Sequence, residues 1–116
     1  ELALQIKEKL NLPYLRFIGA VDMIVETVAV CTGSGGSLIE EFINSRAEVF
    51  ITGDIKYHEA RRVEEFSIGI IDVGHFSSEW MVVDLLFEKL TLAFHEAGFG
   101  IKLIKYKKEK DPFTIF

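Results

Sequence analysis

The stretch Ser67-Ile68-Gly69-Ile70-Ile71-Asp72-Val73-Gly74-His75-Phe76-Ser77-Ser78-Glu79 decides the fold of this chain. Its first part, residues 67–71, is short, rich in isoleucine and free of charge, which predicts a buried β-strand. Gly74 predicts the turn after this strand, and the apolar pattern over residues 77–97 predicts a long helix. A buried strand that passes through a turn into a helix is a building unit of an α/β sheet.

His75 and Glu79 stand four residues apart at the start of the predicted helix. If the helix has begun at His75, both side chains lie on one face, one turn apart. An imidazole and a carboxylate at that spacing suit half of a metal site, although a closed site needs more ligands. Alternatively, His75 caps the helix and Glu79 interacts with the positive end of its dipole. The spacing leaves both interpretations open.

Strands and helices alternate along the rest of the chain. An amphipathic helix is predicted over 2–10 and an edge strand over 14–19. Further strands are predicted over 26–32, 49–52 and 101–106, and further helices from residue 38 and over 57–66. Repeated βαβ units imply parallel strands with right-handed crossovers. The sequence therefore predicts an α/β fold with a mostly parallel sheet, helices on both faces, and one domain over residues 1–116.

Composition limits the class of protein. The chain has 116 residues and a formal net charge of −5, and its pI is near 5.2. An acidic surface disfavours nucleic-acid binding, because it repels a phosphate backbone. No apolar run approaches the roughly 20 residues of a membrane helix, so no membrane partner is expected. The single cysteine, Cys31, excludes an internal disulfide, which fits a cytoplasmic location; we expect it in the core.

Three predicted strands end in loops that carry reactive side chains. In a parallel sheet such loops open on one edge, where ligands collect. The first loop is rich in glycine, the second follows Gly53, and the third follows the buried strand. The candidates are Gly33, Ser34, Gly35 and Gly36, then Asp54, Lys56, Tyr57 and His58, then Asp72, His75 and Glu79. Their convergence predicts a functional site at this edge.

Each loop also has an interpretation without a ligand. The glycine-rich loop can cradle an anion with backbone N–H groups, or it can be a tight turn. Asp54 can act in acid–base chemistry or hold metal, or it can be a helix N-cap. His58 can be a general acid or base near neutral pH, or a packed or exposed helix residue. His95 is expected to be a solvated residue in the last turn of the long helix.

Four segments together resemble the carboxyl-terminal half of the Nif-three-like family, also named type-2 homologues of GTP cyclohydrolase 1 or dinuclear metal-centre hexameric proteins. These segments are Gly33-Ser34-Gly35-Gly36-Ser37-Leu38-Ile39, Phe50-Ile51-Thr52-Gly53-Asp54-Ile55-Lys56-Tyr57-His58-Glu59-Ala60, Ile71-Asp72-Val73-Gly74-His75-Phe76-Ser77-Ser78-Glu79 and Asp111-Pro112-Phe113. Their order and spacing cover nearly the whole chain from about Tyr14 onward.

The resemblance implies an α/β fold, a toroidal homohexamer and two divalent metal ions in each complete subunit. It assigns His75 and Glu79 as metal ligands. It makes Asp54, Lys56, Tyr57 and His58 candidates for contact with the ligands or the substrate. Histidine and carboxylate ligands suit zinc, iron or manganese. The family's first half carries a His-His pair and an aspartate that complete the centre, and no such pair occurs in this chain.

Two functions are compatible with these features. The first is a metal-dependent hydrolase acting on a nucleotide or a phosphorylated or heterocyclic small molecule. In it, His75 and Glu79 hold metal, His58 or Asp54 moves protons, and the loop from Gly33 binds an anion. The second is a non-catalytic metal-binding ring that serves as a scaffold or sensor. In both cases we expect the chain to be the carboxyl-terminal part of a longer protein.

Overall fold

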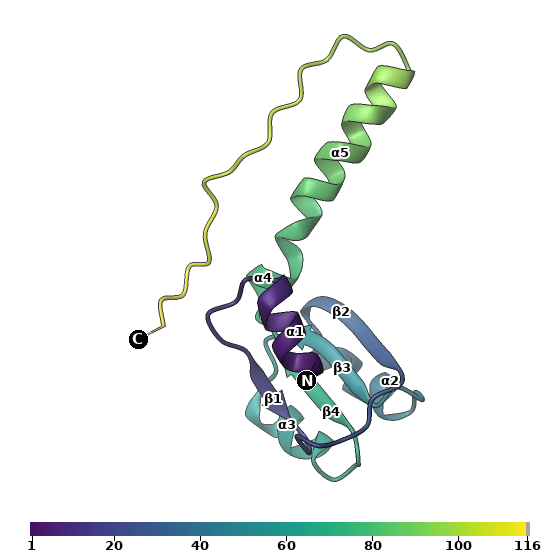
Figure 1. Cartoon of the computed structure of the whole chain (residues 1–116), viewed down its shortest axis with the longest axis vertical. Helices are drawn as coiled ribbons and strands as arrows, with labels where there is room; N and C mark the ends of the chain where they lie inside the picture. The colour runs from purple at the N-terminus through teal and green to yellow at the C-terminus, as the bar shows by residue number, and fades with distance from the viewer. Residues whose placement is uncertain (116) are drawn as a thin grey trace. The chain divides into compact units, whose positions relative to one another are not determined.

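The protein is described by a computed structural model, which covers residues 1–115. The chain divides into two compact units, Glu1–Ser78 and Glu79–Phe116. The first unit holds α1 (Leu2–Lys9), β1 (Arg16–Ile18), β2 (Val28–Ser34), the 3₁₀ helix η1 (Gly36–Leu38), α2 (Ile39–Ile43), β3 (Val49–Gly53), α3 (Tyr57–Val63) and β4 (Gly69–Asp72), as Figure 1 shows. Helix α4 (His75–Glu79) ends at the boundary, and α5 (Met81–Glu96) belongs to the second unit.

The first unit is built on a four-stranded sheet in the order β1-β4-β3-β2. Strands β2, β3 and β4 are parallel, as the βαβ pattern predicts, and β1 runs antiparallel beside β4 at one edge. The predicted edge position of β1 is thus confirmed. The carboxyl ends of the three parallel strands share one edge of the sheet, which confirms the predicted convergence of their loops.

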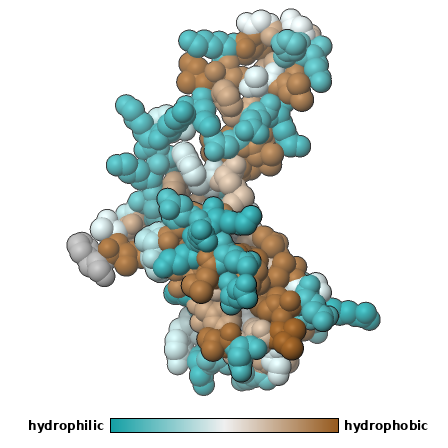
Figure 2. Space-filling model, viewed as in Figure 1, coloured by the Kyte–Doolittle hydropathy of each residue, from teal (hydrophilic) through white to brown (hydrophobic). Residues whose placement is uncertain are grey.

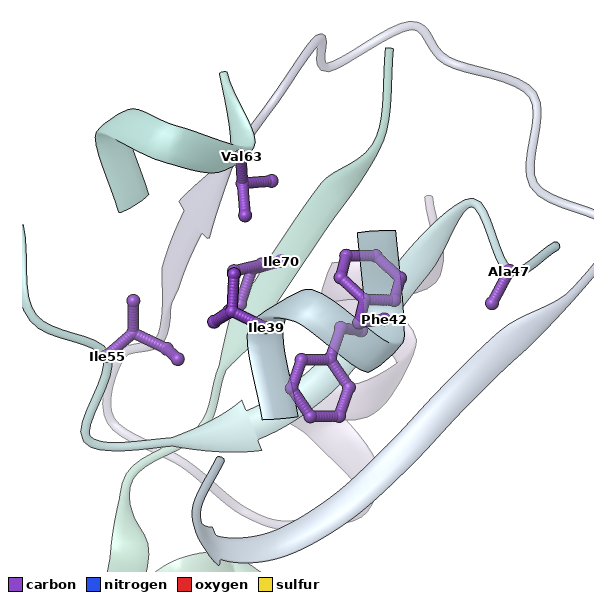
Figure 3. Packing of buried hydrophobic residues seen from close by; sticks show 7 residues of the cluster. Ile39, Phe42, Ala47, Ile55, Val63 and Ile70 are labelled. Atoms are coloured by element: carbon purple, nitrogen blue, oxygen red, sulfur yellow. The ribbon is translucent and has the colours of Figure 1, made fainter. Parts of the chain in front are cut away.

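Each face of this sheet carries its own apolar cluster, with helices on both faces as predicted. On one face, α2 and α3 pack over β3 and β4, and Phe42 and Val63 belong to the apolar cluster between them (Figure 3). The rings of Phe42 and Phe50 stack in this cluster, with 5.1 Å between their centroids. On the other face, α1 packs over Val49 and Ile71, which are both almost fully buried. The most deeply buried side chains come from β3, β4 and α3 and include Val49, Thr52, Val63, Ile70 and Ile71. The two inner parallel strands therefore form the rigid centre that positions the loops at their ends.

Element boundaries differ from the sequence prediction at several places. The strand predicted over 26–32 is β2 over Val28–Ser34, so Gly33 and Ser34 belong to the end of this strand rather than to the loop after it. The helix predicted over 77–97 is two helices, since α4 ends at Glu79 and α5 begins at Met81. Trp80 between them keeps helical backbone angles (φ −54°, ψ −34°). The strand predicted over 101–106 belongs to no sheet within residues 1–115.

The second unit consists of α5 and the extended segment that follows it. Helix α5 has no fully buried residue. Several of its large apolar side chains are about half exposed, including Met81, Val82, Leu85, Leu86 and Leu90. Figure 2 shows hydrophobic residues reaching the surface among hydrophilic ones. Among residues 1–115, the structure contains no helix with the length and apolar character needed to cross a bilayer. The prediction of a single domain over the whole chain stays a prediction.

Candidate site at the carboxyl edge of the sheet

Backbone hydrogen bonds join the three loops at the carboxyl edge. The N–H of Gly35, after β2, donates to the carbonyl oxygen of Gly53 at 3.3 Å. The N–H of Val73, after β4, donates to the carbonyl oxygen of Thr52 at 2.8 Å. The end of β3 is therefore bonded to the segments that follow both of its neighbouring strands, which brings the three loops close together.

Asp54 and His75 form the central pair of this region. The Oδ2 atom of Asp54 lies 2.8 Å from the Nδ1 atom of His75, and each side chain is about half exposed. A carboxylate can only accept, so Nδ1 of His75 carries a proton in this contact, and in the neutral imidazole Nε2 is then the nitrogen with the lone pair. Asp54 has φ +56°, in the left-handed region that aspartate tolerates better than most residues.

The backbone at Gly53 brings these two loops together. A Cβ atom at Gly53 would lie 2.6 Å from the carbonyl carbon of Gly74, closer than atoms can approach without displacement. Gly74 itself has φ +82°, which favours glycine. Both glycines are therefore needed where the β3 and β4 loops touch, and this approach sets the distance between Asp54 and His75.

The N-cap interpretation of Asp54 is wrong. Helix α3 has Lys56 as its N-cap, with extended backbone angles, and the Glu59 carboxylate accepts the Lys56 N–H at 2.8 Å. That interaction is the reciprocal part of a capping box, in which a first-turn carboxylate binds the N-cap N–H. Since Glu59 performs this role, the carboxylate of Asp54 is directed to His75 instead.

Asp72 has a structural role at this edge. The sequence analysis named this residue but did not identify the groups that bind its carboxylate. Its carboxylate is buried, and it accepts hydrogen bonds from the N–H groups of Ile55 at 3.0 Å and Gly74 at 2.9 Å. It also forms an ion pair with Arg16 of β1. Arg16 in turn donates to the carbonyl oxygen of Ile55 at 3.0 Å. One buried carboxylate thus fixes both the Asp54 loop and the His75 loop.

Ser78 also holds this edge together, and the sequence analysis did not name it as a candidate. It is buried, and its Oγ accepts the N–H of Gly33 and donates to the carbonyl oxygen of His75, both at 2.7 Å. Ser78 therefore links the glycine-rich loop to the helix that carries His75. The sequence signal that could have identified Ser78 is its position in the Gly74–Glu79 motif, between the candidate metal ligands His75 and Glu79.

Close packing accounts for the glycines of the β2 loop. A Cβ atom at Gly35 would lie 2.1 Å from the Thr52 hydroxyl, and one at Gly36 would lie 2.4 Å from a carboxylate oxygen of Glu59. The N–H groups of Gly33 and Gly35 donate within the protein, as described above. An anion-binding role for Gly33, Ser34, Gly35 and Gly36 stays a prediction.

The remaining candidates lie around this centre. Lys56, Tyr57 and His58 stand at the start of α3, and all three are exposed. Glu79 is the last residue of α4, four residues after His75. Cys31 is only partly buried, against the cluster under α2 and α3, rather than fully in the core as expected. His95 lies in the last turn of α5, and its side chain is exposed as expected.

The donor set at this edge fits part of a metal's coordination shell. An imidazole whose ring N–H is bound by a carboxylate is a common arrangement at metal-binding histidines. Within residues 1–115, however, no group of three or more histidine, cysteine, aspartate or glutamate side chains is close enough to hold an ion. These residues alone therefore do not complete a site.

The fold and this edge define an α/β protein with three neighbouring loops at the ends of its parallel strands. The family model described as Duf34/NIF3 (NGG1p interacting factor 3) matches residues 1–112. The chain belongs to this family, which confirms the resemblance found from its motifs.

Curated relatives support the same assignment. A protein from Clostridium acetobutylicum named GTP cyclohydrolase 1 type 2 homolog is 34% identical over 113 residues, which cover 97% of this chain and 42% of that protein. A protein of the same name from Bacillus subtilis is 31% identical over 114 residues, covering 98% of this chain and 30% of that protein. The chain therefore spans less than half the length of these relatives.

Solved structures confirm the α/β fold. A hypothetical protein from Staphylococcus aureus has a TM-score of 0.90 at 32% identity and covers 98% of this chain, which corresponds to 38% of that protein. A Bacillus cereus protein related to NIF3 has a TM-score of 0.89 at 26% identity, with 98% of this chain and 31% of that chain covered.

Proposed function

We propose that the carboxyl edge of the sheet is a divalent-metal half-site of a metal-dependent hydrolase, with His75 and Glu79 as the metal ligands. The observation that carries this proposal is the 2.8 Å contact between Asp54 Oδ2 and His75 Nδ1. Metal-binding histidines commonly donate their second ring N–H to a carboxylate, which fixes the tautomer and the ring orientation. Asp54 supplies that carboxylate, so Nε2 of His75 is the ligating atom.

Glu79 supplies the second ligand of the proposal. It follows His75 by one helical turn in α4, the spacing at which two side chains of a helix lie on the same face. Imidazole and carboxylate together suit zinc, iron or manganese. Tight metal binding needs further ligands besides these two. We propose that other chains or other parts of a longer protein provide them, as in a hexameric ring with two metal ions in each complete subunit.

The proposed substrate is a nucleotide or a phosphorylated or heterocyclic small molecule. Several relatives carry the name GTP cyclohydrolase 1 type 2 homolog, which is consistent with this class. A bound divalent ion would act as a Lewis acid toward such a substrate. Lys56 and Tyr57 are exposed at the start of α3 and can contact its polar groups, and the neighbouring His58 can transfer a proton.

Calorimetric titration of the chain with Zn²⁺ and Mn²⁺, after purification without chelator, tests the metal part. We expect His75→Ala to abolish the binding that the unchanged chain shows, whereas His95→Ala should retain it. Equal affinities in both variants would refute the assignment of His75. The loaded protein is then screened against nucleotides and phosphoesters. Metal binding without turnover would favour the alternative function, a non-catalytic metal-binding scaffold or sensor.

A further inference from the structure

Two buried side chains hold the backbone on either side of His75. The carboxylate of Asp72 accepts the N–H of Gly74 at 2.9 Å. The hydroxyl of Ser78 donates to the carbonyl oxygen of His75 at 2.7 Å. Asp54, by contrast, contacts the imidazole ring itself. The direction in which the ring leaves the backbone is therefore fixed separately from the contact that the ring makes.

The hydroxyl of Ser78 makes more than a local helix bond. A serine hydroxyl commonly binds the carbonyl oxygen three residues earlier, and Ser45, just after α2, does so to Phe42 at 2.7 Å. The second contact of the Ser45 hydroxyl is also local, since it accepts the N–H of Ala47 at 3.1 Å. The hydroxyl of Ser78 instead accepts the N–H of Gly33 at 2.7 Å, 45 residues earlier in the chain. Ser78 therefore joins the start of α4 to β2.

Strand β2 is irregular at the residue that Ser78 binds. Residues 31–33 of β2 stand opposite Thr52 alone in β3, so β2 carries two extra residues there. Bulges of this kind change the direction of backbone groups and are frequent beside functional sites. Gly33 is buried and has φ +69°, which favours glycine, and its N–H donates to Ser78. The bulge thus directs a buried backbone donor to the helix that carries His75.

Asp72 and Ser78 connect the His75 turn to different strands. Asp72 binds Arg16 of β1 and the N–H of Ile55 after β3. Ser78 binds β2, at the other end of the order β1-β4-β3-β2. Because β4 leads directly into the His75 turn, these contacts hold the turn from both sides of its strand. Loss of the Ser78 hydroxyl would leave it held from one side only.

We propose that Ser78 is a positioning residue for His75. By holding the carbonyl oxygen of His75 against the bulge of β2, it keeps the imidazole in contact with Asp54 and Nε2 directed to the metal. Ser78 acts through the backbone of His75 and needs no contact with metal or substrate. This inference rests on the proposed function, since it concerns the orientation of the same metal ligand.

Nitrogen NMR of the neutral histidine rings, without added metal, gives the first test. We expect Ser78→Ala to move His75 from the form protonated on Nδ1 toward the form protonated on Nε2, because the ring contacts Asp54 for less of the time. Ser45→Ala is the matched control, since it also removes a hydroxyl bound three residues back, and it should leave the His75 spectrum unchanged. An unchanged His75 spectrum in Ser78→Ala overturns the proposal.

A second comparison separates positioning from loss of stability. Val63→Ala removes fully buried apolar atoms from α3 and also destabilises the first unit, but it should retain the His75 spectrum. Ser78→Thr keeps the hydroxyl and should retain the spectrum as well. If Val63→Ala shifted His75 as much as Ser78→Ala, the effect would be one of general destabilisation, and the proposal would be wrong.

Hydrogen exchange of the unchanged chain tests the contact without any variant. The amide of Gly33 should exchange as slowly as the paired amides of β3, because Ser78 binds it in a buried position. Fast exchange at Gly33 would show that Ser78 does not hold the bulge, and it would overturn the proposal however the variants fold.

A double-mutant cycle shows whether Ser78 acts through the contact between Asp54 and His75. If it does, Ser78→Ala should change the His75 tautomer in the unchanged background but add nothing in the Asp54→Gly background. Equal effects in both backgrounds would mean that the hydroxyl acts on the ring directly, which contradicts a positioning role.

Calorimetric titration with Zn²⁺ separates this inference from the proposed function. Loss of a residue that orients a metal ligand typically weakens metal binding about tenfold or more, so we expect a decrease of this size in Ser78→Ala and none in Ser45→Ala. If the unchanged chain bound no Zn²⁺, the proposed function would fail, and the NMR comparison would still decide the role of Ser78. Zn²⁺ binding that His75→Ala abolishes and Ser78→Ala fully retains would support the proposed function and overturn this inference.

Discussion

Arg16 of β1 forms an ion pair with Asp72 at the end of β4, and the exposure of the two side chains is unequal: 57% for Arg16 and 2% for Asp72. The carboxylate is therefore buried, while the guanidinium that balances its charge still reaches water. The N–H groups of Ile55 and Gly74 complete the hydrogen bonding of this carboxylate. Asp72 thus connects Arg16 of the antiparallel edge strand β1 to the loops at the ends of the parallel strands, and in this way β1 stabilises those loops.

Replacement of Asp72 by alanine should lower the free energy of unfolding by about 3 kcal/mol, because two N–H groups lose their acceptor and the ion pair is broken. Urea unfolding followed by circular dichroism measures this change. Asp22→Ala, at an exposed position in a turn, is the control and should change the unfolding free energy by less than about 0.5 kcal/mol. Similar midpoints for the two variants would show that Asp72 does not hold the loops.

Asp54→Gly should change the tautomer of neutral His75. Glycine tolerates the positive φ of this position and removes the carboxylate that holds the proton on Nδ1. Nitrogen NMR of the imidazole rings should show a protonated Nδ1 in the unchanged chain and a shift toward protonated Nε2 in Asp54→Gly. The resonances of His58 serve as the internal control. An unchanged His75 spectrum would mean that Asp54 does not orient this ring.

Gly53→Ala should destabilise the first unit by about 2 kcal/mol, because the added methyl group would force the β3 and β4 loops apart. Gly100→Ala is the matched control, since no atom lies within 4 Å of a Cβ built there. Chemical unfolding of both variants gives the comparison. If Gly53→Ala were as stable as Gly100→Ala, the approach of the two loops would not depend on glycine.

The sequence predicted the parallel part of the sheet well, because uncharged β-branched segments followed by glycine turns report burial and chain reversal directly. It also named Asp54 and His75 separately. Their pairing was not predictable, since it arises from the register in which Thr52 lies beside Asp72, 20 residues further along the chain. Register depends on the packing of whole strands, which no local pattern contains.

The sequence also could not predict which polar residues far apart in the chain contact each other, or which strands lie side by side. Arg16 lies in the predicted edge strand and remains exposed, but its ion pair with Asp72 requires β1 to run antiparallel beside β4. The alternation over residues 101–106 predicted a strand, but these residues form no strand in the described part of the chain. Alternation reports two different faces, however, and it does not specify the neighbouring strand that completes a sheet.

Glu48 should make the stability of the first unit depend on pH. Its carboxylate accepts the N–H groups of Thr27 at 2.6 Å and Glu26 at 3.1 Å, and these bonds hold the pKa of Glu48 below its usual value of 4.5. A carboxyl group with a lowered folded-state pKa stabilises the protein above its unfolded-state pKa. That stabilisation is lost as the pH falls through the folded-state pKa, when the carboxylate takes up a proton.

The melting temperature of Glu48→Gln should therefore lie below that of the unchanged chain at pH 7, and the two values should converge as the pH falls below about 4. Thermal unfolding followed by circular dichroism at several pH values measures both. Glu65→Gln, at an exposed position just after α3, should match the unchanged chain at pH 7. A difference for Glu48→Gln that stays constant down to the lowest pH would mean that the neutral carboxyl group binds these N–H groups equally well. In that case, charge would contribute nothing to the contact between Glu48 and the start of β2.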